Sequence, residues 1–302
     1  MAGSVWRRAS EGTVWNLTAL VDRIAAHLLA AQRTVALTGA GISTPSGIPD
    51  FRSPGDGLWR QVNPEAVASL VGFRRNPRAF SAWLRPLVQR IVSAEPNAAH
   101  CALAALERAG LLRAIITQNI DGLHQKAGSQ RVLELHGHLR EASCLRCGYQ
   151  TPTAGLIEAF LSSGRPPGCP HCGGALKPAV VLFGEMLPVD VLHEAEEEVA
   201  ACDLMLVAGS SLSVAPASLL PQWAVDHGSQ LIIINRTPTD LDPLAEVVLR
   251  DDVAEVLPAV AAACGVDVPR PRWRSPSIPD GSAGSSNRST NAPNTTSTEE
   301  IP

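Results

Sequence analysis

Four of the seven cysteines form two Cys-x-x-Cys pairs. Cys144 and Cys147 make the first pair, Cys169 and Cys172 make the second, and 21 residues separate the two pairs. This spacing is typical of paired zinc knuckles, in which four thiolates bind one tetrahedral Zn2+; a redox pair and free core thiols are the alternatives. Because four thiolates fill the coordination sphere, we predict a structural zinc ion that holds a small module together and performs no chemistry.

Small and hydrogen-bonding residues follow four short apolar segments, which are the strongest strand candidates in the chain. The segments 34–38, 112–117, 204–208 and 231–234 are followed in turn by Gly39-Ala40-Gly41, Gln118-Asn119, Gly209-Ser210-Ser211 and Asn235-Arg236. Any one of these ends could be an ordinary turn. Because ligands of open α/β sheets bind outside the carboxyl ends of the strands, the four ends together predict one shared polar crevice.

Two features near the first of these strands suit a phosphate group. Gly39 and Gly41 would let the backbone approach a phosphate closely, although Thr44 stands where the dinucleotide fingerprint has its third glycine. Arg52, which follows Pro49-Asp50-Phe51, could clamp a pyrophosphate with its guanidinium or could be an ordinary surface arginine.

Other residues offer hydrogen bonds with no ionic partner in view. Gln118, Asn119 and Asp121 lie directly after an apolar segment. Their amide and carboxylate groups could recognise, by hydrogen bonds, an uncharged amide and the hydroxyls of a ribose in a ligand. His136 follows a short apolar run. It is either a structural histidine or, through its approach to the crevice, a general base.

A parallel sheet covered on both faces would position these residues. Leu17, Leu20, Ile24 and Leu28 recur at helical spacing and predict a helix that leads into the first strand. Helical stretches alternate with short apolar strands, as in βαβ units of α/β proteins. From about residue 265 the chain is rich in Pro, Ser, Thr, Asn and Gly, which predicts a disordered tail.

Composition limits the classes of function. With 302 residues, 45% hydrophobic and 18% charged, the chain is expected to be globular with about two structural units. A net charge of −4 predicts no basic face, so we expect no nucleic-acid partner. The charge-free run 204–225 contains two prolines and a glycine, which favours strand, loop and helix over a membrane span. Charged residues interrupt the apolar stretch 17–31, so we predict no secretory signal and a cytoplasmic location.

The motifs, taken in order, resemble those of the sirtuins, which are NAD-dependent protein deacylases. They are Gly39 to Ser43, Gly47 to Arg52, Thr117 to Asp121, His136-Gly137, the four cysteines, Val181 to Glu185 and Gly209 to Leu212. The resemblance extends from about residue 17 to 260. It implies an α/β fold with a Rossmann-type parallel sheet, an inserted small zinc-binding module and a helical insert.

The resemblance also implies how the chain is divided. Residues 1–52, 96–138 and 179–264 would form the Rossmann-type NAD-binding domain. The helical insert would be 53–95, the zinc-knuckle module 139–178, and the tail 265–302. Substrate and NAD would meet in the cleft between these parts.

By the same resemblance, individual residues acquire expected roles. The expected NAD-binding residues are Gly39, Ala40, Gly41, Thr44, Asp50, Phe51, Arg52, Gln118, Asn119, Ile120, Asp121, His136, Gly209, Ser210, Ser211, Asn235, Arg236 and Val253. His136 would be the general base, and Asn119 would position ribose and water. Val181 and Phe183 would line the acyl-lysine tunnel, and 180–185 would pair with the substrate peptide as an added strand.

The implied reaction consumes NAD and transfers the acyl group of a protein lysine to ADP-ribose, releasing nicotinamide. The product would be 2′-O-acyl-ADP-ribose, and the partners would be acylated proteins or peptides. A mono-ADP-ribosyltransferase and a non-catalytic NAD-sensing zinc module remain as alternatives. The protein substrates and the oligomeric state stay open.

The helical insert bears on acyl choice. Sirtuins that prefer succinyl or malonyl lysine carry a Tyr and an Arg three residues apart there. In this chain Leu84 and Leu87 align with that pair, and the single tyrosine is Tyr149 in the first knuckle. We therefore predict a neutral acyl group, with Arg85 as the residue that a shift of one position would turn inward.

Overall fold

A six-stranded parallel sheet forms the centre of the computed structural model, which describes residues 6–8, 14–50 and 64–269. The strands are, in spatial order, β11 (Val247–Leu249), β10 (Gln230–Ile234), β9 (Leu204–Ala208), β3 (Thr34–Thr38), β4 (Ala114–Thr117) and β5 (Val132–Glu134). All neighbours pair in parallel. The chain builds outward in both directions from β3, so the strand order reverses between β3 and β9, which is where such sheets bind ligands.

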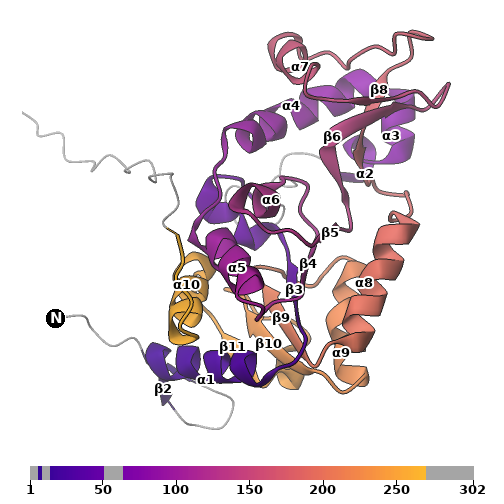
Figure 1. Cartoon of the computed structure of the whole chain (residues 1–302). Helices are drawn as coiled ribbons and strands as arrows, with labels where there is room; N and C mark the ends of the chain where they lie inside the picture. The colour runs from indigo at the N-terminus through magenta and orange to yellow at the C-terminus, as the bar shows by residue number, and fades with distance from the viewer. Residues whose placement is uncertain (1–5, 9–13, 51–63, 270–302) are drawn as a thin grey trace, which may run out of the picture.

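Helices cover both faces of this sheet because its strands are apolar on both sides. On one face lie α1 (Leu17–Ala30), α5 (Ala98–Arg108) and α10 (Val253–Ala263). On the other lie α8 (Val189–Ala201) and α9 (Leu220–Asp226). Figure 1 shows the two helix layers on either side of the sheet. Ahead of α1, β1 (Trp6–Arg8) and β2 (Val14–Asn16) pair antiparallel.

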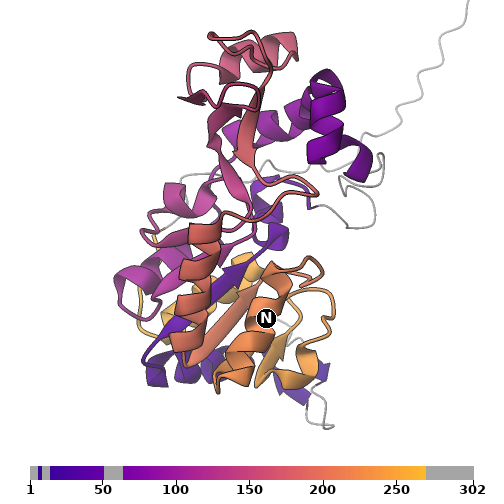
Figure 2. The ribbon, with the colours of Figure 1, turned by 90° about the vertical axis from the view of Figure 1, so that its right-hand side faces the viewer.

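A second, smaller lobe lies above the carboxyl edge of the sheet in Figures 1 and 2. It contains an antiparallel sheet in the order β7 (Gln150–Pro152), β6 (Gly137–Cys144), β8 (Leu176–Val180). Its helices are α2 (Pro64–Val67), α3 (Leu70–Arg75), α4 (Pro77–Ser93) and α7 (Ile157–Ser163). Phe73, Phe80 and Leu84 pack with Phe160 of α7 and Val180 of β8 in one apolar cluster, so the helical insert and the zinc-side sheet share a core.

The predicted α/β fold with a Rossmann-type sheet is confirmed. The predicted apolar stripe of α1 buries Leu20, Ile24 and Leu28. Two boundaries differ, because β4 begins at Ala114 rather than at residue 112 and β10 at Gln230 rather than at 231. The edge strands β5 and β11 were not expected, since each has only three residues and little periodicity to detect.

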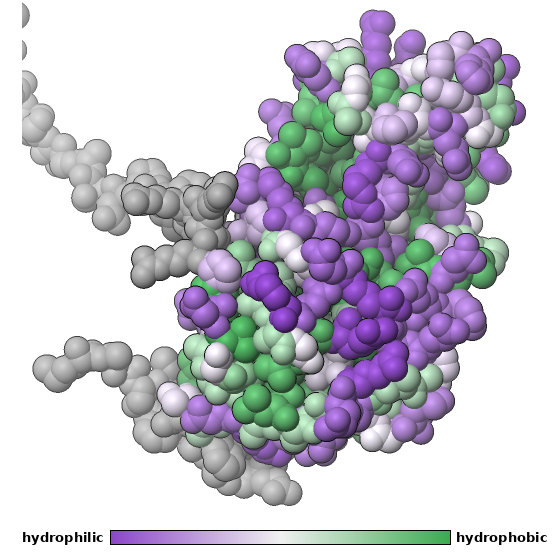
Figure 3. Space-filling view, in the orientation of Figure 1, coloured by the Kyte–Doolittle hydropathy of each residue, from purple (hydrophilic) through white to green (hydrophobic). Residues whose placement is uncertain are grey.

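The apolar run 204–225 is divided among β9, a loop and most of α9. Within the described residues, none of the helices has the length and apolar character needed to cross a bilayer. The face drawn in Figure 3 is mostly hydrophilic, with separate hydrophobic areas on each lobe.

Candidate active site

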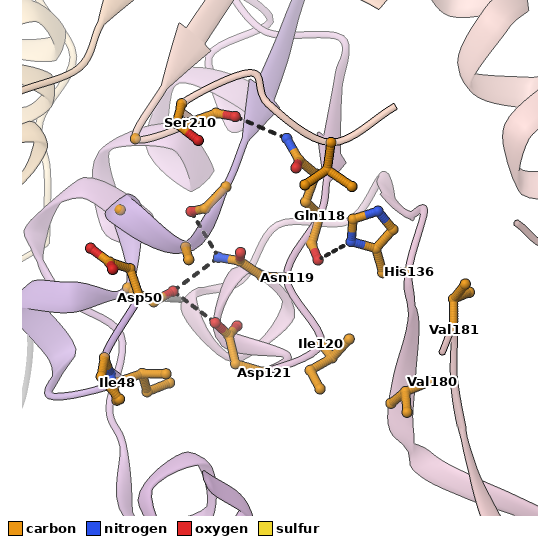
Figure 4. A pocket seen from close by; sticks show the side chains of 18 of the residues that line it. Ile48, Asp50, Gln118, Asn119, Ile120, Asp121, His136, Val180, Val181 and Ser210 are labelled. Carbon is orange, nitrogen blue, oxygen red and sulfur yellow. Dashed lines mark hydrogen bonds between the residues drawn. The ribbon is translucent and has the colours of Figure 1, made fainter. Parts of the chain in front are cut away.

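A cavity of about 1150 Å3 opens at the carboxyl edge of the central sheet, where the two lobes meet. Its walls are residues that follow β3, β4, β9 and β10, together with α4 and the segment 180–187. Figure 4 shows Gln118, Asn119, Asp121 and His136 around this cavity, with Val180 and Val181 on the far side. The predicted shared crevice is therefore present, at the switch point between β3 and β9.

The loops after β3 and β9 touch backbone to backbone. The Gly41 amide donates a hydrogen bond of 2.8 Å to the Gly209 carbonyl. A Cβ at Gly41 would lie 2.7 Å from that carbonyl oxygen, and one at Gly209 would lie 2.4 Å from the Ile42 nitrogen. Only glycine fits at either position, and the resulting wall of bare backbone suits a phosphate group.

Hydrogen bonds hold the amide side chains of the site in place (Figure 4). Asn119 Nδ2 donates to the Gly39 carbonyl and to Ser43 Oγ, both at 3.1 Å. Gln118 Nε2 donates to Ser210 Oγ at 2.9 Å and thus joins the β4 and β9 loops. Hydrogen bonds within the protein thus orient these side chains, which reduces the entropy lost on binding.

Asp121 extends the same network. Its carboxylate accepts hydrogen bonds from the Ser43 hydroxyl at 2.7 Å and from the Leu123 amide at 2.9 Å. Burial raises the pKa of this carboxyl, and the two hydrogen bonds oppose the rise. A carboxylate held beside Ile120 in the cavity can accept a hydrogen bond from a ligand carboxamide.

His136 lies beside Gln118 at the edge of this network (Figure 4). Its Nδ1 is 2.9 Å from the Gln118 carbonyl oxygen, which can only accept, so Nδ1 carries the proton. In the neutral ring Nε2 is then unprotonated. Because burial lowers the pKa of His136 below 6.5, the ring is neutral at pH 7 and can act as a base.

A buried layer of histidines supports the site from behind. The Asn97 amide donates to His100 Nδ1, so His100 Nε2 donates to Ser43 Oγ at 3.4 Å. His124 Nε2 lies 2.9 Å from the Thr38 hydroxyl. Burial lowers the pKa of both rings, that of His124 to about 3, so both are neutral scaffolding.

An apolar channel forms the other end of the cavity. Its lining includes Trp83, Leu84, Leu87, Ile91, Val180, Val181, Leu182 and Phe183, and also the exposed Arg90 of α4. Leu84 and Leu87 are 4% and 3% exposed. Arg85 turns away, because its Nε donates to the Leu161 carbonyl in α7 at 2.6 Å. The helix register thus directs leucines into the cavity, and the alternative with Arg85 inward is excluded.

The four predicted zinc ligands form one cluster in the small lobe. All four sulfur atoms lie within 4.8 Å of one another. Cys144 Sγ is 3.4 Å from Cys172 Sγ, and Cys147 Sγ is 3.6 Å from Cys169 Sγ. Zn–S bonds of about 2.3 Å in a tetrahedron place the sulfurs about 3.8 Å apart. The donor set and spacing fit a structural Zn2+ with no open position.

Comparison with known proteins decides the family. The family model described as "Sir2 family" matches residues 39–216. This chain belongs to the Sir2 family. The sirtuin resemblance of the motifs is thereby confirmed.

Individual relatives of this sirtuin match over most of their length. "NAD-dependent protein deacylase 2" of Archaeoglobus fulgidus is 50% identical over 240 residues, which are 79% of this chain and 94% of the relative. A solved Sir2 structure with deacetylated p53 peptide and 3′-O-acetyl ADP-ribose is 40% identical at a TM-score of 0.77, covering 82% and 99% of the two chains. A Sir2 structure with p53 peptide and NAD+ is 41% identical at a TM-score of 0.74, covering 80% and 98%.

The sirtuin cavity brings together the expected site residues that the structure describes. It is lined by Gly39, Ala40, Gly41, Thr44, Asp50, Gln118, Asn119, Ile120, Asp121, His136, Val181, Phe183, Gly209, Ser210, Ser211, Asn235, Arg236 and Val253. Phe51 and Arg52 lie outside the described residues. The contact that each residue makes with NAD or peptide stays a prediction, as do the domain boundaries.

Several residues of the site were not expected. Ser43 belongs to the Gly39–Ser43 motif, and its place after the glycines is the signal that could have found it. His100 carries no local signal, because α5 buries it behind the cavity. Asp251 and Asp252 line the cavity beside Val253, and because the strand before them, β11, has only three residues, little in the sequence could have found them.

Proposed function

We propose that this sirtuin removes acetyl or other neutral acyl groups from protein lysines in an NAD-dependent reaction. The observation that carries the proposal is that a neutral, oriented histidine base, His136, faces the same cavity as Asn119 and an apolar channel. The prediction of NAD-dependent protein deacylase activity is confirmed by the names of the relatives. The products would be nicotinamide, free lysine and 2′-O-acyl-ADP-ribose.

Bound NAD supplies an electrophilic ribose carbon and nicotinamide as the leaving group. The glycine-walled loops 39–41 and 209–211 would hold its phosphates, with Ser210 already fixed by Gln118. Asp121 and Ile120 would hold the nicotinamide carboxamide. Asn119 would orient the ribose and the attacking water from its fixed position between Gly39 and Ser43.

His136 would accept a proton at Nε2 from a ribose hydroxyl. The hydrogen bond from Nδ1 to the Gln118 carbonyl sets the ring orientation and stabilises the imidazolium that results. The apolar side of the cavity excludes water around the acyl group, so electrostatic effects of Asn119 and Asp121 act in a low dielectric.

The substrate would be an acylated lysine on a protein or peptide. Its aliphatic stem would occupy the channel between Val181 and Phe183 on one side and Leu84 and Leu87 on the other. Sir2 structures with acetylated and propionylated peptides support this class of partner.

Two finer features belong to the same proposal. Because the acyl group ends on ADP-ribose, the reaction is a group transfer, which makes the enzyme a transferase. We place it in the cytoplasm, where thiols stay reduced and can bind zinc and where NAD is available. Fluorescence of a fusion protein, with cell fractionation, tests the location.

Nicotinamide release in the presence and absence of acetyl-lysine peptide tests the function. We expect release that requires both NAD and the acetylated peptide, with the unmodified peptide as control. An ADP-ribosyltransferase would release nicotinamide without the acyl group and would leave ADP-ribose on protein, and a sensor would release none.

A further inference from the structure

Lys177, in β8, is a buried lysine beside the segment that borders the acyl channel. Its side chain is only 7% exposed. The ammonium Nζ lies 2.9 Å from Glu185 Oε2 and donates to the carbonyls of Val180 at 2.7 Å and Pro178 at 3.2 Å. A buried ammonium is stable only when it is paired, and Glu185 is its one charged partner among these three.

Glu185 holds the turn that follows. Its Oε2 accepts a hydrogen bond of 2.8 Å from the Leu182 amide, and its own amide donates to the Leu182 carbonyl at 2.9 Å. The Glu185 side chain is itself mostly buried, at 19% exposed. One carboxylate oxygen thus joins the backbone of the turn to the Lys177 ammonium.

The segment 180–185 is anchored at both sides of the cavity. The Val181 amide donates to the carbonyl of His136 at 2.8 Å. The Phe183 amide donates to the Ala68 carbonyl, and the Leu70 amide donates to the Phe183 carbonyl. The segment therefore spans the distance from the general base to the helical insert, and its position sets the width of the channel.

We propose that the Lys177–Glu185 ion pair is a positioning device for the acylated peptide. The pair fixes the segment 180–185 so that Val181 and Phe183 form the channel wall before substrate arrives. The proposal rests on the deacylase function and assigns it two further residues. The loops 39–41 and 209–211, which would bind NAD, are held by separate hydrogen bonds from Gln118 and Asn119. Loss of the Lys177–Glu185 pair should therefore weaken peptide binding and leave NAD binding unchanged.

Steady-state kinetics of Lys177→Met and Lys177→Arg test the proposal. Methionine keeps the volume of the stem and removes the charge. We expect the KM for acetyl-lysine peptide to rise about tenfold or more while the KM for NAD stays within about twofold, and arginine to restore most of the peptide KM. A purely structural defect would lower kcat with the folded fraction and leave the peptide KM unchanged.

Glu185→Gln provides a second test if Lys177→Met does not fold. Glutamine can still accept from the Leu182 amide but offers no charge to Lys177, so we again expect a raised peptide KM. The double variant should be no worse than the worse single variant, because the two residues act as one unit. Lys126→Met is the control. It breaks an exposed ion pair, with Lys126 Nζ 2.7 Å from Glu95 Oε1, that involves neither Lys177 nor Glu185.

Calorimetric titration of acetyl-lysine peptide, with ADP-ribose present, gives a readout independent of turnover. Weaker peptide binding in Lys177→Met or Glu185→Gln, with ADP-ribose binding retained, supports the proposal. A peptide KM and Kd within twofold of wild type in the folded variants overturn it. Absence of acetyl-peptide-dependent nicotinamide release by the wild-type enzyme would instead overturn the deacylase function.

Discussion

The two lobes hold their functional residues by different means. At the carboxyl edge of the sheet, Asn119, Asp121 and His136 are held by hydrogen bonds above a large apolar core. Around its cysteines the zinc module has a small separate cluster of Ala142, Cys144, Cys169 and Leu176, two of which are predicted zinc ligands, while its Phe160 packs with the helical insert. The site residues thus lie on a large apolar core, whereas the part of the module around the cysteines buries few apolar side chains and is expected to depend on its metal.

The contrast matters because the two regions meet at His136, the proposed general base. β6, which leads to Cys144, begins at Gly137 directly after His136. The segment 180–185, which borders the acyl channel, also continues from β8, the strand that pairs with β6. The metal-dependent lobe should therefore control the peptide side of the cavity, and the packed lobe the NAD side. Changes in the two lobes should therefore have separable effects on peptide binding and on NAD binding.

The largest effect is expected from His136→Ala. Loss of a positioned base should lower the rate of deacetylation about 10²–10⁴-fold. ADP-ribose binding should persist, because residues other than His136 hold the loops 39–41 and 209–211. Nicotinamide release and calorimetry measure the two quantities. His193→Ala, at an exposed position of α8, is the matched control. Near wild-type turnover of His136→Ala would falsify the assignment of the base.

Replacing Cys169 by serine should remove the zinc and unfold the module, since metal binding and folding are coupled in such knuckles. We expect about one zinc per chain in the wild type and none in the variant, a protease-sensitive small lobe, and loss of acetyl-peptide binding. ADP-ribose affinity should change by less than about threefold, because the sheet lobe has its own core. Cys264→Ser, outside the cluster, should keep its zinc.

Metal analysis with limited proteolysis checks this prediction. Zinc-free protein that still deacetylates at the full rate would contradict the dependence of the peptide side on the metal. Equal loss of peptide and ADP-ribose binding would contradict the independence of the two lobes.

The preference of the enzyme between two acyl groups tests only the side of the cavity that would bind the peptide. Leu84 and Leu87 offer no partner to a carboxylate, and an unpaired buried charge is costly, so we expect acetyl-lysine to exceed succinyl-lysine about 100-fold or more in kcat/KM. One peptide bearing either group is the matched substrate pair. Leu84→Tyr combined with Leu87→Arg should narrow the difference. Equal turnover of the two substrates by the wild type would contradict the apolar channel.

The smallest effect concerns pH. His136 must be neutral to accept a proton, so kcat/KM should be level at high pH and fall about tenfold per pH unit below its pKa. Because burial lowers that pKa, the midpoint should lie below 6.5. A pH profile with recovery of activity on return to neutral pH measures it. A midpoint above 6.5 would show that His136 is stabilised in its charged form.

Much of the fold and site could be predicted because the signals are local. The cysteine spacing identifies the knuckles, and the polar ends of apolar strands identify the crevice. The layer containing His100 and His124 could not be predicted, since its hydrogen bonds join residues far apart in sequence. The Lys177–Glu185 pair was equally hidden, because a lysine in an ordinary strand gives no sign that it is buried.

Mass spectrometry of the wild-type products distinguishes NAD-dependent deacylation from the alternative reactions of NAD. Incubation with NAD and an acetyl-lysine peptide should yield free lysine peptide, nicotinamide and O-acetyl-ADP-ribose in equal amounts. Transfer of ADP-ribose to the peptide or the protein, or hydrolysis of NAD with the acetyl group left on the lysine, would contradict it.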